Sequence, residues 1–502
     1  MSTLKIGWGR RSLNIDAPVS LPGQFYMRIS ERIHDPLYIT VLCVDGGEDV
    51  AFFGTVDAVS LGGPTTLASI RELVKAKRPE LPGEAIILGC THTHAGVGIV
   101  DTPESTPDGQ PIYPGSKCRE FFIQQCADAI VEAWDNRANG GMAYGYGYAT
   151  VAHSRRVIYF DDTSLRHGAQ MTAPNGHGIM YGDTNDDQFS HYEAGTDHFL
   201  NAMFTFDAEQ KVTGIVINVP CPSQLSEHFR MQSSDFWNEV REMVAQEYGE
   251  NVYVLPQCAA AGDLSPRVLH YNYAQSRRFK LKYGVEAHPF DFDNIQKPEC
   301  YNKIMCERRD IAQRIMEAVR DIYSWAKKDI QTDVTVRHSV ETLQLPKRKI
   351  TDEEKLWCED NIKFMEAQLE EKKKGTAEEV RKAVSTHQAI VSRNKRAITR
   401  WETQDADPNL AMECHVVRVG DIAFATNRFE LYMDFMHRIQ ARSPFIQTFV
   451  IQLAGAEGGS YLPTERGVAN KGYSASIFCN MVGPEGGQVL VNETLRMLND
   501  LK

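Results

Sequence analysis

Two histidines follow an apolar run in the stretch Ala85-Ile86-Ile87-Leu88-Gly89-Cys90-Thr91-His92-Thr93-His94-Ala95-Gly96. The run predicts a buried strand, and the glycines that follow predict its end. Side chains two residues apart along a strand point to the same face, so we expect His92 and His94 to share one side. Neutral imidazole is a common zinc ligand, and the pair therefore indicates a metal site. Two surface histidines, or one ligand beside one hydrogen-bonding partner, are the alternatives.

The composition is typical of a globular protein with a large core. The 502 residues are 42% hydrophobic and 24% charged, with a formal net charge of -12. A nucleic-acid surface would need a basic patch, so we expect no nucleic-acid partner. No run reaches the roughly 18 apolar residues of a membrane span, and no signal peptide is visible, so we expect no membrane partner. Eleven cysteines without zinc-ribbon spacing predict reduced thiols and a cytoplasmic location.

Strands alternate with helices along the chain, which predicts an α/β fold of mixed β-sheets flanked by helices. The patterns predict strands over 38–44, 50–53, 85–90, 199–206, 212–219, 252–255, 415–419, 422–425 and 449–453. They predict helices over 64–77, 117–136 and 301–327. Ser233-Ser234-Asp235 predicts the cap of a further helix through Val240 and Val244.

Residues 346–403 form the clearest separable unit. Thr351-Asp352-Glu353-Glu354 and Thr376-Ala377-Glu378-Glu379 both match the capping box, and Gly375 is placed to end the first helix. We predict an antiparallel helical hairpin over 346–403, inserted into a catalytic domain made of 1–345 and 404–502. The hairpin could join two copies of the chain, and a solvated, mobile excursion is the alternative.

Two further motifs lie at predicted strand ends. Gly262-Asp263-Leu264-Ser265-Pro266 would let backbone and hydroxyl approach a ligand closely, although a plain turn has the same composition. His153-Ser154-Arg155-Arg156 follows an alternation of tyrosine and glycine. Taken alone, the arginine pair predicts a solvated turn.

Five stretches, in order along nearly the whole chain, resemble motifs of the neutral ceramidases. Thr91–Gly96 is similar to Thr-His-Thr-His-Ser-Gly of that family, and 262–266 is similar to Gly-Asp-Val-Ser-Pro. The others are Ser234-Asp235, the segment ending in Glu430, and Tyr461-Leu462-Pro463-Thr464 with Tyr473 following. The ordered set implies a ceramidase-like catalytic fold.

The resemblance also implies a chemistry and its residues. Family members hold one zinc ion with two histidines, a glutamate and a tyrosine, and cleave an amide bond. Carried over by position, this implies His92, Glu430 and Tyr461 as zinc ligands. It places His94, Arg155 and Tyr473 around the substrate carbonyl, where donors can stabilise an oxyanion. The resemblance places Ser265 close to the metal, either as a nucleophile or as a hydrogen-bonding group.

The chain departs from the family at the second zinc histidine. Cys221-Pro222 stands where the family has His-Pro. A thiolate is an acceptable zinc ligand, so we expect Cys221 to be the fourth ligand. His228, Gln224 or loss of the metal are the alternatives.

The expected function is that of a zinc-dependent hydrolase of an amide bond in a small, polar substrate. Ceramidases carry a further immunoglobulin-like domain after the last motif, whereas this chain ends soon after it. A ceramide substrate at a membrane is therefore not expected. The same site could serve ester, lactone or carbohydrate chemistry. A non-catalytic protein that binds a partner through the hairpin is the alternative of another class.

Overall fold

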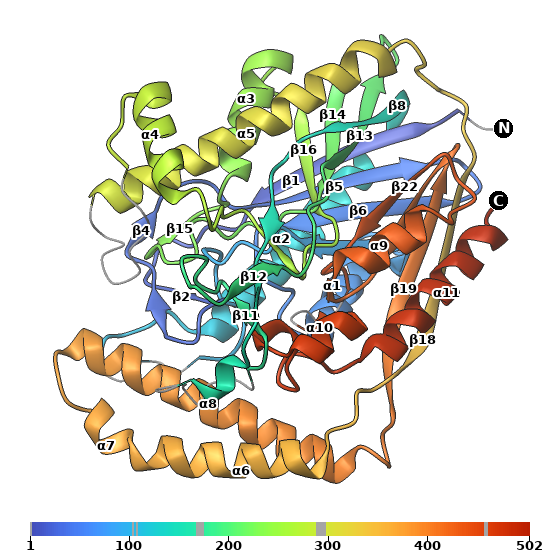
Figure 1. Cartoon of the computed structure of the whole chain (residues 1–502). Helices are drawn as coiled ribbons and strands as arrows, with labels where there is room; N and C mark the ends of the chain where they lie inside the picture. Colours follow the sequence, from blue (N-terminus) through green and yellow to red (C-terminus); the bar gives the residue numbers. More distant parts are fainter. Residues whose placement is uncertain (1–2, 103–104, 107–108, 167–174, 288–297, 456–459) are drawn as a thin grey trace.

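The computed structural model describes residues 3–102, 105–106, 109–166, 175–287, 298–455 and 460–502. Its largest element is an eight-stranded mixed sheet (Figure 1). In spatial order the strands are β16 (Tyr253–Cys258), β14 (Val212–Val219), β13 (Phe199–Asp207), β8 (Ala138–Tyr148), β1 (Lys5–Ser12), β5 (Tyr38–Asp45), β6 (Val50–Val56) and β7 (Ile86–Cys90). The pairs β14–β16 and β6–β7 are parallel, and the other pairs are antiparallel.

A second, four-stranded sheet packs on the first. It consists of β18 (Val336–Pro346), β19 (Asn409–Val419), β20 (Ile422–Thr426) and β22 (Gln447–Ile451). Alternation along β5 explains the packing: Ile39 and Val41 join a core with helices, whereas Leu42 and Val44 join a core with the second sheet. Both faces are buried, which is why the strands read as nearly continuous apolar runs.

Helices cover the outer faces of the two sheets. α1 (Pro64–Lys77) and α2 (Gly115–Asp135) lie against β1 and β5–β7, and α3 (Trp237–Tyr248) and α5 (Pro298–Ala326) lie against β8, β13, β14 and β16. α9 (Met433–Gln440) and α11 (Pro484–Asp500) cover the four-stranded sheet (Figure 1). The prediction of an α/β fold with mixed sheets and flanking helices is confirmed.

The large sheet is strongly coiled. Its two edge strands, β16 and β7, therefore come close together. Just after β22, the backbone N–H of Gln452 donates to Cys258 O at 3.0 Å, which joins the end of the second sheet to the end of β16. The carboxyl ends of β7, β14, β16 and β20 thus lie near one another. Loops from all four ends can contribute to one site.

Three helices form a projecting unit at the lower edge of Figure 1. They are α6 (Asp352–Ala367), α7 (Leu369–Lys372) and α8 (Ala377–Thr403). Both predicted capping boxes are present, at Thr351 and Thr376. α8 is tied to the rest of the chain, because Met27 N donates to Ser385 Oγ at 2.9 Å and Arg393 lies over the Phe25 ring. The division into a catalytic domain and an inserted hairpin stays a prediction.

Two local expectations from the sequence are wrong. α3 begins at Trp237, and its N-cap, Phe236, makes no side-chain cap bond. Asp235 instead takes a left-handed conformation (φ 59°) and accepts from Ser226 N at 2.5 Å. The Arg155-Arg156 pair is not a solvated turn, because both side chains are fully buried among acceptors.

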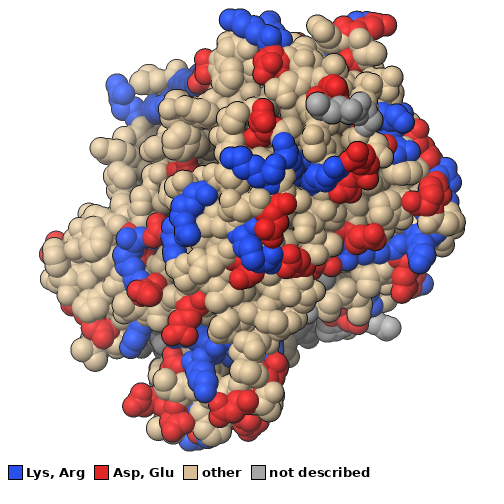
Figure 2. All heavy atoms as spheres, turned by 90° about the vertical axis from the view of Figure 1, so that its right-hand side faces the viewer, with Lys and Arg blue, Asp and Glu red and all other residues tan. Residues whose placement is uncertain are grey.

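The surface carries charges of both signs. On the face that Figure 2 shows, basic and acidic side chains are interspersed. Exposed charges also pair with one another, and Arg496 contacts Glu341, Glu493 and Asp500. None of the helices in the described segments is long and apolar enough to cross a membrane. All eleven cysteines are buried free thiols, as predicted.

Candidate active site

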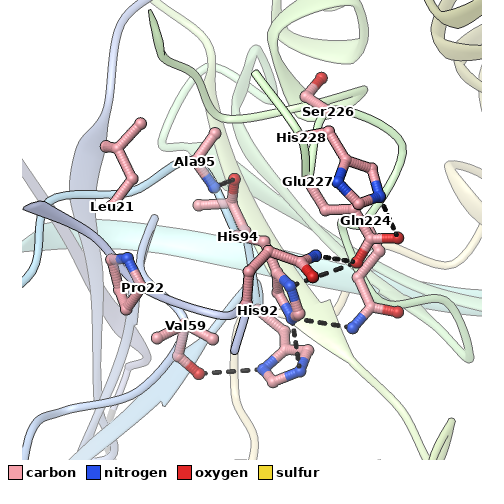
Figure 3. A network of polar contacts seen from close by, with 12 residues as sticks. Leu21, Pro22, Val59, His92, His94, Ala95, Gln224, Ser226, Glu227 and His228 are labelled. Atoms are coloured by element: carbon pink, nitrogen blue, oxygen red, sulfur yellow. Dashed lines mark hydrogen bonds and ion pairs between the residues drawn. The ribbon is translucent and has the colours of Figure 1, made fainter. Parts of the chain in front are cut away.

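His92 and His94 meet just beyond the end of β7. Their Nε2 atoms lie 3.3 Å apart, and the rings are arranged edge to face (Figure 3). The two side chains converge, but not by strand alternation as expected. β7 ends at Cys90, and His92 adopts a left-handed conformation with φ 62°. Such backbone strain in a residue other than glycine is typical of functional sites.

Hydrogen bonds set the tautomers of both imidazoles. His92 Nδ1 lies 2.9 Å from Val59 O, a carbonyl that can only accept, so Nδ1 carries the proton. His94 Nδ1 faces Glu227 Oε2 at 3.3 Å, while His94 Nε2 accepts from the Gln224 amide at 2.9 Å. The Nε2 atoms of the two rings face each other, and in the neutral form of each ring that atom carries a lone pair. Two apposed lone pairs repel unless a proton or a cation lies between them.

Glu430 and Tyr461 reach the same place through a short parallel pair of strands. β21 (Glu430–Leu431) and β23 (Tyr461–Leu462) place the two residues side by side. Glu430 Oε2 is 3.5 Å from His92 Nε2. The peptide at Gly262 passes so close that a Cβ there would lie 2.3 Å from Glu430 O, which explains the glycine.

Arg155 is the buried cation of the site. Its Nη2 lies 3.3 Å from Glu430 Oε2 and 3.2 Å from Tyr461 Oη, and donates to Gly262 O at 2.9 Å. Its backbone N–H is fixed by Asp263 O at 3.1 Å. Arg155 is therefore part of the cluster, and its role as an oxyanion-stabilising donor stays a prediction.

Ser265 and Tyr473 lie at the margins of this cluster. β17 (Leu264–Ser265) pairs with β9 (His153–Ser154), the strand immediately before Arg155, and Ser265 Oγ accepts from Arg267 N at 3.2 Å. The Tyr473 ring packs edge to face on Tyr461, with 6.0 Å between centroids. Both predicted residues are therefore near the cluster without contacting either histidine in the described structure.

Cys221 is not brought into the cluster. Its Sγ donates to Val151 O at 3.4 Å, and its side chain belongs to the apolar core of α3 and α5. Burial raises the pKa of this thiol well above its ordinary value, which disfavours the thiolate that zinc would bind. The place nearest the histidines is taken by Gln224 instead, and Cys221 as a ligand stays a prediction.

Several site residues were missed from the sequence. Glu227 pairs with Arg267 and faces His94, and Tyr181 contacts Arg155, with 3.4 Å from Nη1 to Oη. His228, one of the alternative ligands, hydrogen-bonds Tyr26 at 2.6 Å through its Nδ1. The run Ser226-Glu227-His228, which begins five residues after Cys221, was a usable signal for Glu227. Nothing in the sequence around Tyr181 pointed to the site.

The electrostatics of the cluster favour a neutral imidazole at His94 and a charged carboxylate at Glu430. Burial lowers the pKa of His94 to about 4. Burial alone would raise the pKa of Glu430, but His92 and Arg155 together lower it to about 2. Burial raises the pKa of the Tyr461 phenol well above its ordinary value. At neutral pH the site therefore combines the Glu430 carboxylate, the Tyr461 phenol and a neutral imidazole at His94.

This donor set fits a metal ion in part. Zinc binds nitrogen and oxygen about 2.0–2.1 Å away in a tetrahedron, so its donors lie roughly 3.3 Å from one another. His92 Nε2 is 3.3 Å from His94 Nε2 and 3.5 Å from Glu430 Oε2. In the parts of the chain that are described, however, no group of three or more His, Cys, Asp and Glu side chains is arranged as a complete metal centre. The two separations that match the edges of a zinc tetrahedron both involve His92 Nε2.

The sheets, the strand-end loops and the buried polar cluster define an α/β protein with a neutral-ceramidase-like fold. Among solved structures, neutral ceramidase from Pseudomonas aeruginosa matches with a TM-score of 0.66 and 15% identity, over 100% of this chain and 75% of that chain. A structure described as ceramidase complexed with C2 matches with a TM-score of 0.64, at the same identity and coverage. No family model and no curated protein matches the chain. The likeness to ceramidases therefore establishes the fold.

Proposed function

We propose that the protein is a hydrolase that cleaves an amide bond in a small polar substrate at the His92 site. The observation that carries the proposal is the meeting of His92, His94, Glu430, Arg155 and Tyr461 at the strand ends. Buried polar groups cost folding free energy unless they are fully paired, so such a cluster is retained for chemistry more readily than for stability.

The cluster also supports a bound zinc ion as cofactor. His92 and Glu430 would hold it, with His94 or Tyr461 as the nearest further donors. When bound, zinc would polarise a carbonyl and lower the pKa of a water molecule. The Val59 carbonyl orients the His92 ring, in the way that outer groups usually orient metal-binding histidines.

The chain's own residues supply the remaining chemistry. Arg155 keeps its charge, because Tyr461, Tyr181 and Glu430 raise its pKa despite burial. Together with the Tyr461 phenol it provides donors for a carbonyl oxygen that gains negative charge. His94 is held between Gln224 and Glu227. If Tyr461 rather than His94 completes the zinc site, His94 can take a proton from the attacking water molecule at Nε2 and deliver it to the departing amine.

Turnover and metal content together test the proposal. The wild type and His92→Ala are compared on matched amides, esters and glycosides, with circular dichroism as a check on folding. Amide turnover is expected in the wild type, with a loss of at least a hundredfold in His92→Ala. Ester or glycoside turnover without amide turnover would replace the proposed reaction, and equal turnover by His92→Ala would exclude this site.

Elemental mass spectrometry tests the metal separately. We expect close to one zinc ion per chain in the wild type and in Cys221→Ser, because the Cys221 thiol faces Val151. His92→Ala is expected to lose it. Loss of zinc in Cys221→Ser would instead support the thiolate ligand, and no metal in the wild type would contradict the cofactor assignment.

A further inference from the structure

A polar cavity of about 200 Å³ adjoins the His92 site. Two residues belong to both. Tyr181 lines the cavity and contacts Arg155, and Arg267 lines it and pairs with Glu227, which faces His94. The cavity therefore lies next to residues that contact the proposed catalytic cluster.

Tyr181 lies at the border of the cavity and the Arg155 side of the site. It adopts a left-handed conformation with φ 58°, and its backbone N–H donates to Arg155 O at 2.7 Å. Its ring lies between two guanidinium groups, 6.0 Å from Arg155 and 5.8 Å from Arg267. Strain of this kind persists where the surrounding structure over-determines it, as it does at binding sites.

The cavity is lined mainly by hydrogen-bonding groups. Of the described residues around it, Val268 and Leu269 have aliphatic side chains. The polar ones include Asp183, Glu307, Arg267, Lys303 and Asn272. A lipid chain would displace the water that solvates these groups and would offer them no hydrogen bonds in return.

The charges of the lining are balanced. Asp183 and Glu307 offset Arg267 and Lys303, so a strongly charged ligand gains no net attraction. Lys303 Nζ lies 3.1 Å from Asn272 Oδ1 and 3.6 Å from Glu307 Oε1, which places donors and acceptors next to one another. Burial raises the pKa of Glu307, against the influence of Lys303 and Arg267. Hydroxyl groups, which both donate and accept, match such a lining.

We infer that this cavity binds the hydroxyl-rich part of the substrate, a single sugar or polyol ring. The inference rests on the proposed function, because it takes the cavity as the substrate side of the His92 site. The size agrees, since about 200 Å³ corresponds to roughly seven water molecules and lies below the usual range of pockets for larger ligands.

Binding to the full chain by titration calorimetry tests the inference without requiring turnover. The probes are N-acetylglucosamine, myo-inositol and N-butylacetamide, the last with an amide but no hydroxyls. We expect saturable binding of at least one of the first two, and binding of N-butylacetamide at least tenfold weaker. Equal or stronger binding of N-butylacetamide, or no binding of either hydroxylated probe, would overturn the inference.

Variants on one helix locate the site. Glu307→Gln, in α5, is expected to weaken binding of the hydroxylated probe at least tenfold. Glu317→Gln, an exposed carboxylate in the same helix, is the matched control and should bind as the wild type does. If Glu307→Gln does not fold, Asn272→Ala, at the start of α4 (Asn272–Tyr283), takes its place. Unchanged binding in the folded variant would place the ligand elsewhere.

Amine release distinguishes this inference from the proposed function. Binding of N-acetylglucosamine without release of the amine, and without hydrolysis of any amide, would contradict the function and leave the cavity assignment intact. Hydrolysis of N-butylacetamide in preference to N-acetylglucosamine would support the proposed amide hydrolysis and contradict the cavity assignment.

Discussion

At the His92 site, Arg155, Glu430 and Glu227 are buried and each contacts several partners, whereas along α6–α8 the ion pairs lie at the surface. Lys374 and Glu371, for instance, are three residues apart, with 69% and 77% of their side chains exposed. The first kind of charge is costly to remove alone, because its partner stays buried. The second kind contributes little, because water replaces the lost contact. The buried charges therefore hold the side chains of the site in place, whereas the exposed ion pairs do not.

The largest expected effect is on the buried pair next to the site. Arg156 and Glu193 are joined by two contacts, Nε to Oε2 at 2.5 Å and Nη2 to Oε1 at 3.0 Å, with side chains 0% and 1% exposed. Arg156→Met leaves the buried Glu193 carboxylate without its cation, although Asn470 still donates to it at 2.8 Å. We expect a loss of roughly 3–5 kcal/mol in the free energy of unfolding by urea. Lys374→Met is the surface control, with a change below about 0.5 kcal/mol.

The double variant Arg156→Met/Glu193→Leu sharpens this result. Removing both charges is expected to recover part of the loss, since it removes the penalty of the unpaired carboxylate. The Gly467 and Lys471 carbonyls, which accept from Arg156, stay without this donor in both variants. Equal stabilities of Arg156→Met and Lys374→Met would show that the buried charge contributes no more to the free energy of unfolding than the surface charge.

An intermediate effect on stability is expected at Asp310 in α5. Its carboxylate contacts Arg278, Lys282 and Arg314. Burial would raise its pKa, but these cations lower it to about 2. Because the pKa is lower in the folded chain than the roughly 3.9 of the unfolded chain, Asp310 stabilises the fold above about pH 4. This contribution is lost as the pH falls toward 2.

Acid unfolding of Asp310→Asn measures this dependence. The variant should be less stable than the wild type at pH 6, and the difference should shrink as the pH falls toward 2. Asp360→Asn in α6, where the side chain is half exposed, should follow the wild-type profile. A constant difference for Asp310→Asn at all pH values would show that its effect is steric.

The smallest effect is expected at the cap of α8. The Thr376 hydroxyl accepts from Glu379 N, and the Glu379 side chain accepts in turn from Thr376 N. Thr376→Ala should cost about 1 kcal/mol in thermal unfolding, whereas Thr376→Ser should keep most of the stability. Turnover should not change in either variant. A loss of turnover in Thr376→Ala alone would show that α8 positions the site.

The elements that follow local rules could be predicted from the sequence. The capping boxes at Thr351 and Thr376, the strand before His92 and the helix over Pro64–Lys77 all follow from short-range patterns. The resemblance to ceramidases also led to the fold that the structural comparison supports.

The parts that depend on distant segments could not be predicted. The local sequence predicts a solvated turn at Arg155-Arg156. The two side chains are buried because they pair with Glu430 and Glu193, which lie far away in the sequence. The orientation of Cys221 depends on the core of α3 and α5, and the backbone strain at Tyr181 depends on Arg155. The curvature of the large sheet decides which distant side chains come into contact. Short-range sequence patterns do not describe that curvature.

The left-handed backbone at His92 makes this residue unusually suitable for chemical complementation. Glycine adopts φ near 60° without strain, so His92→Gly would delete the ring while leaving the chain path as it is. The space left beside Val59 O has the shape of an imidazole, and free imidazole added to the variant is expected to restore part of the turnover. Substituted imidazoles of graded basicity would then show whether the ring at this position acts mainly through its lone pair or by carrying a proton.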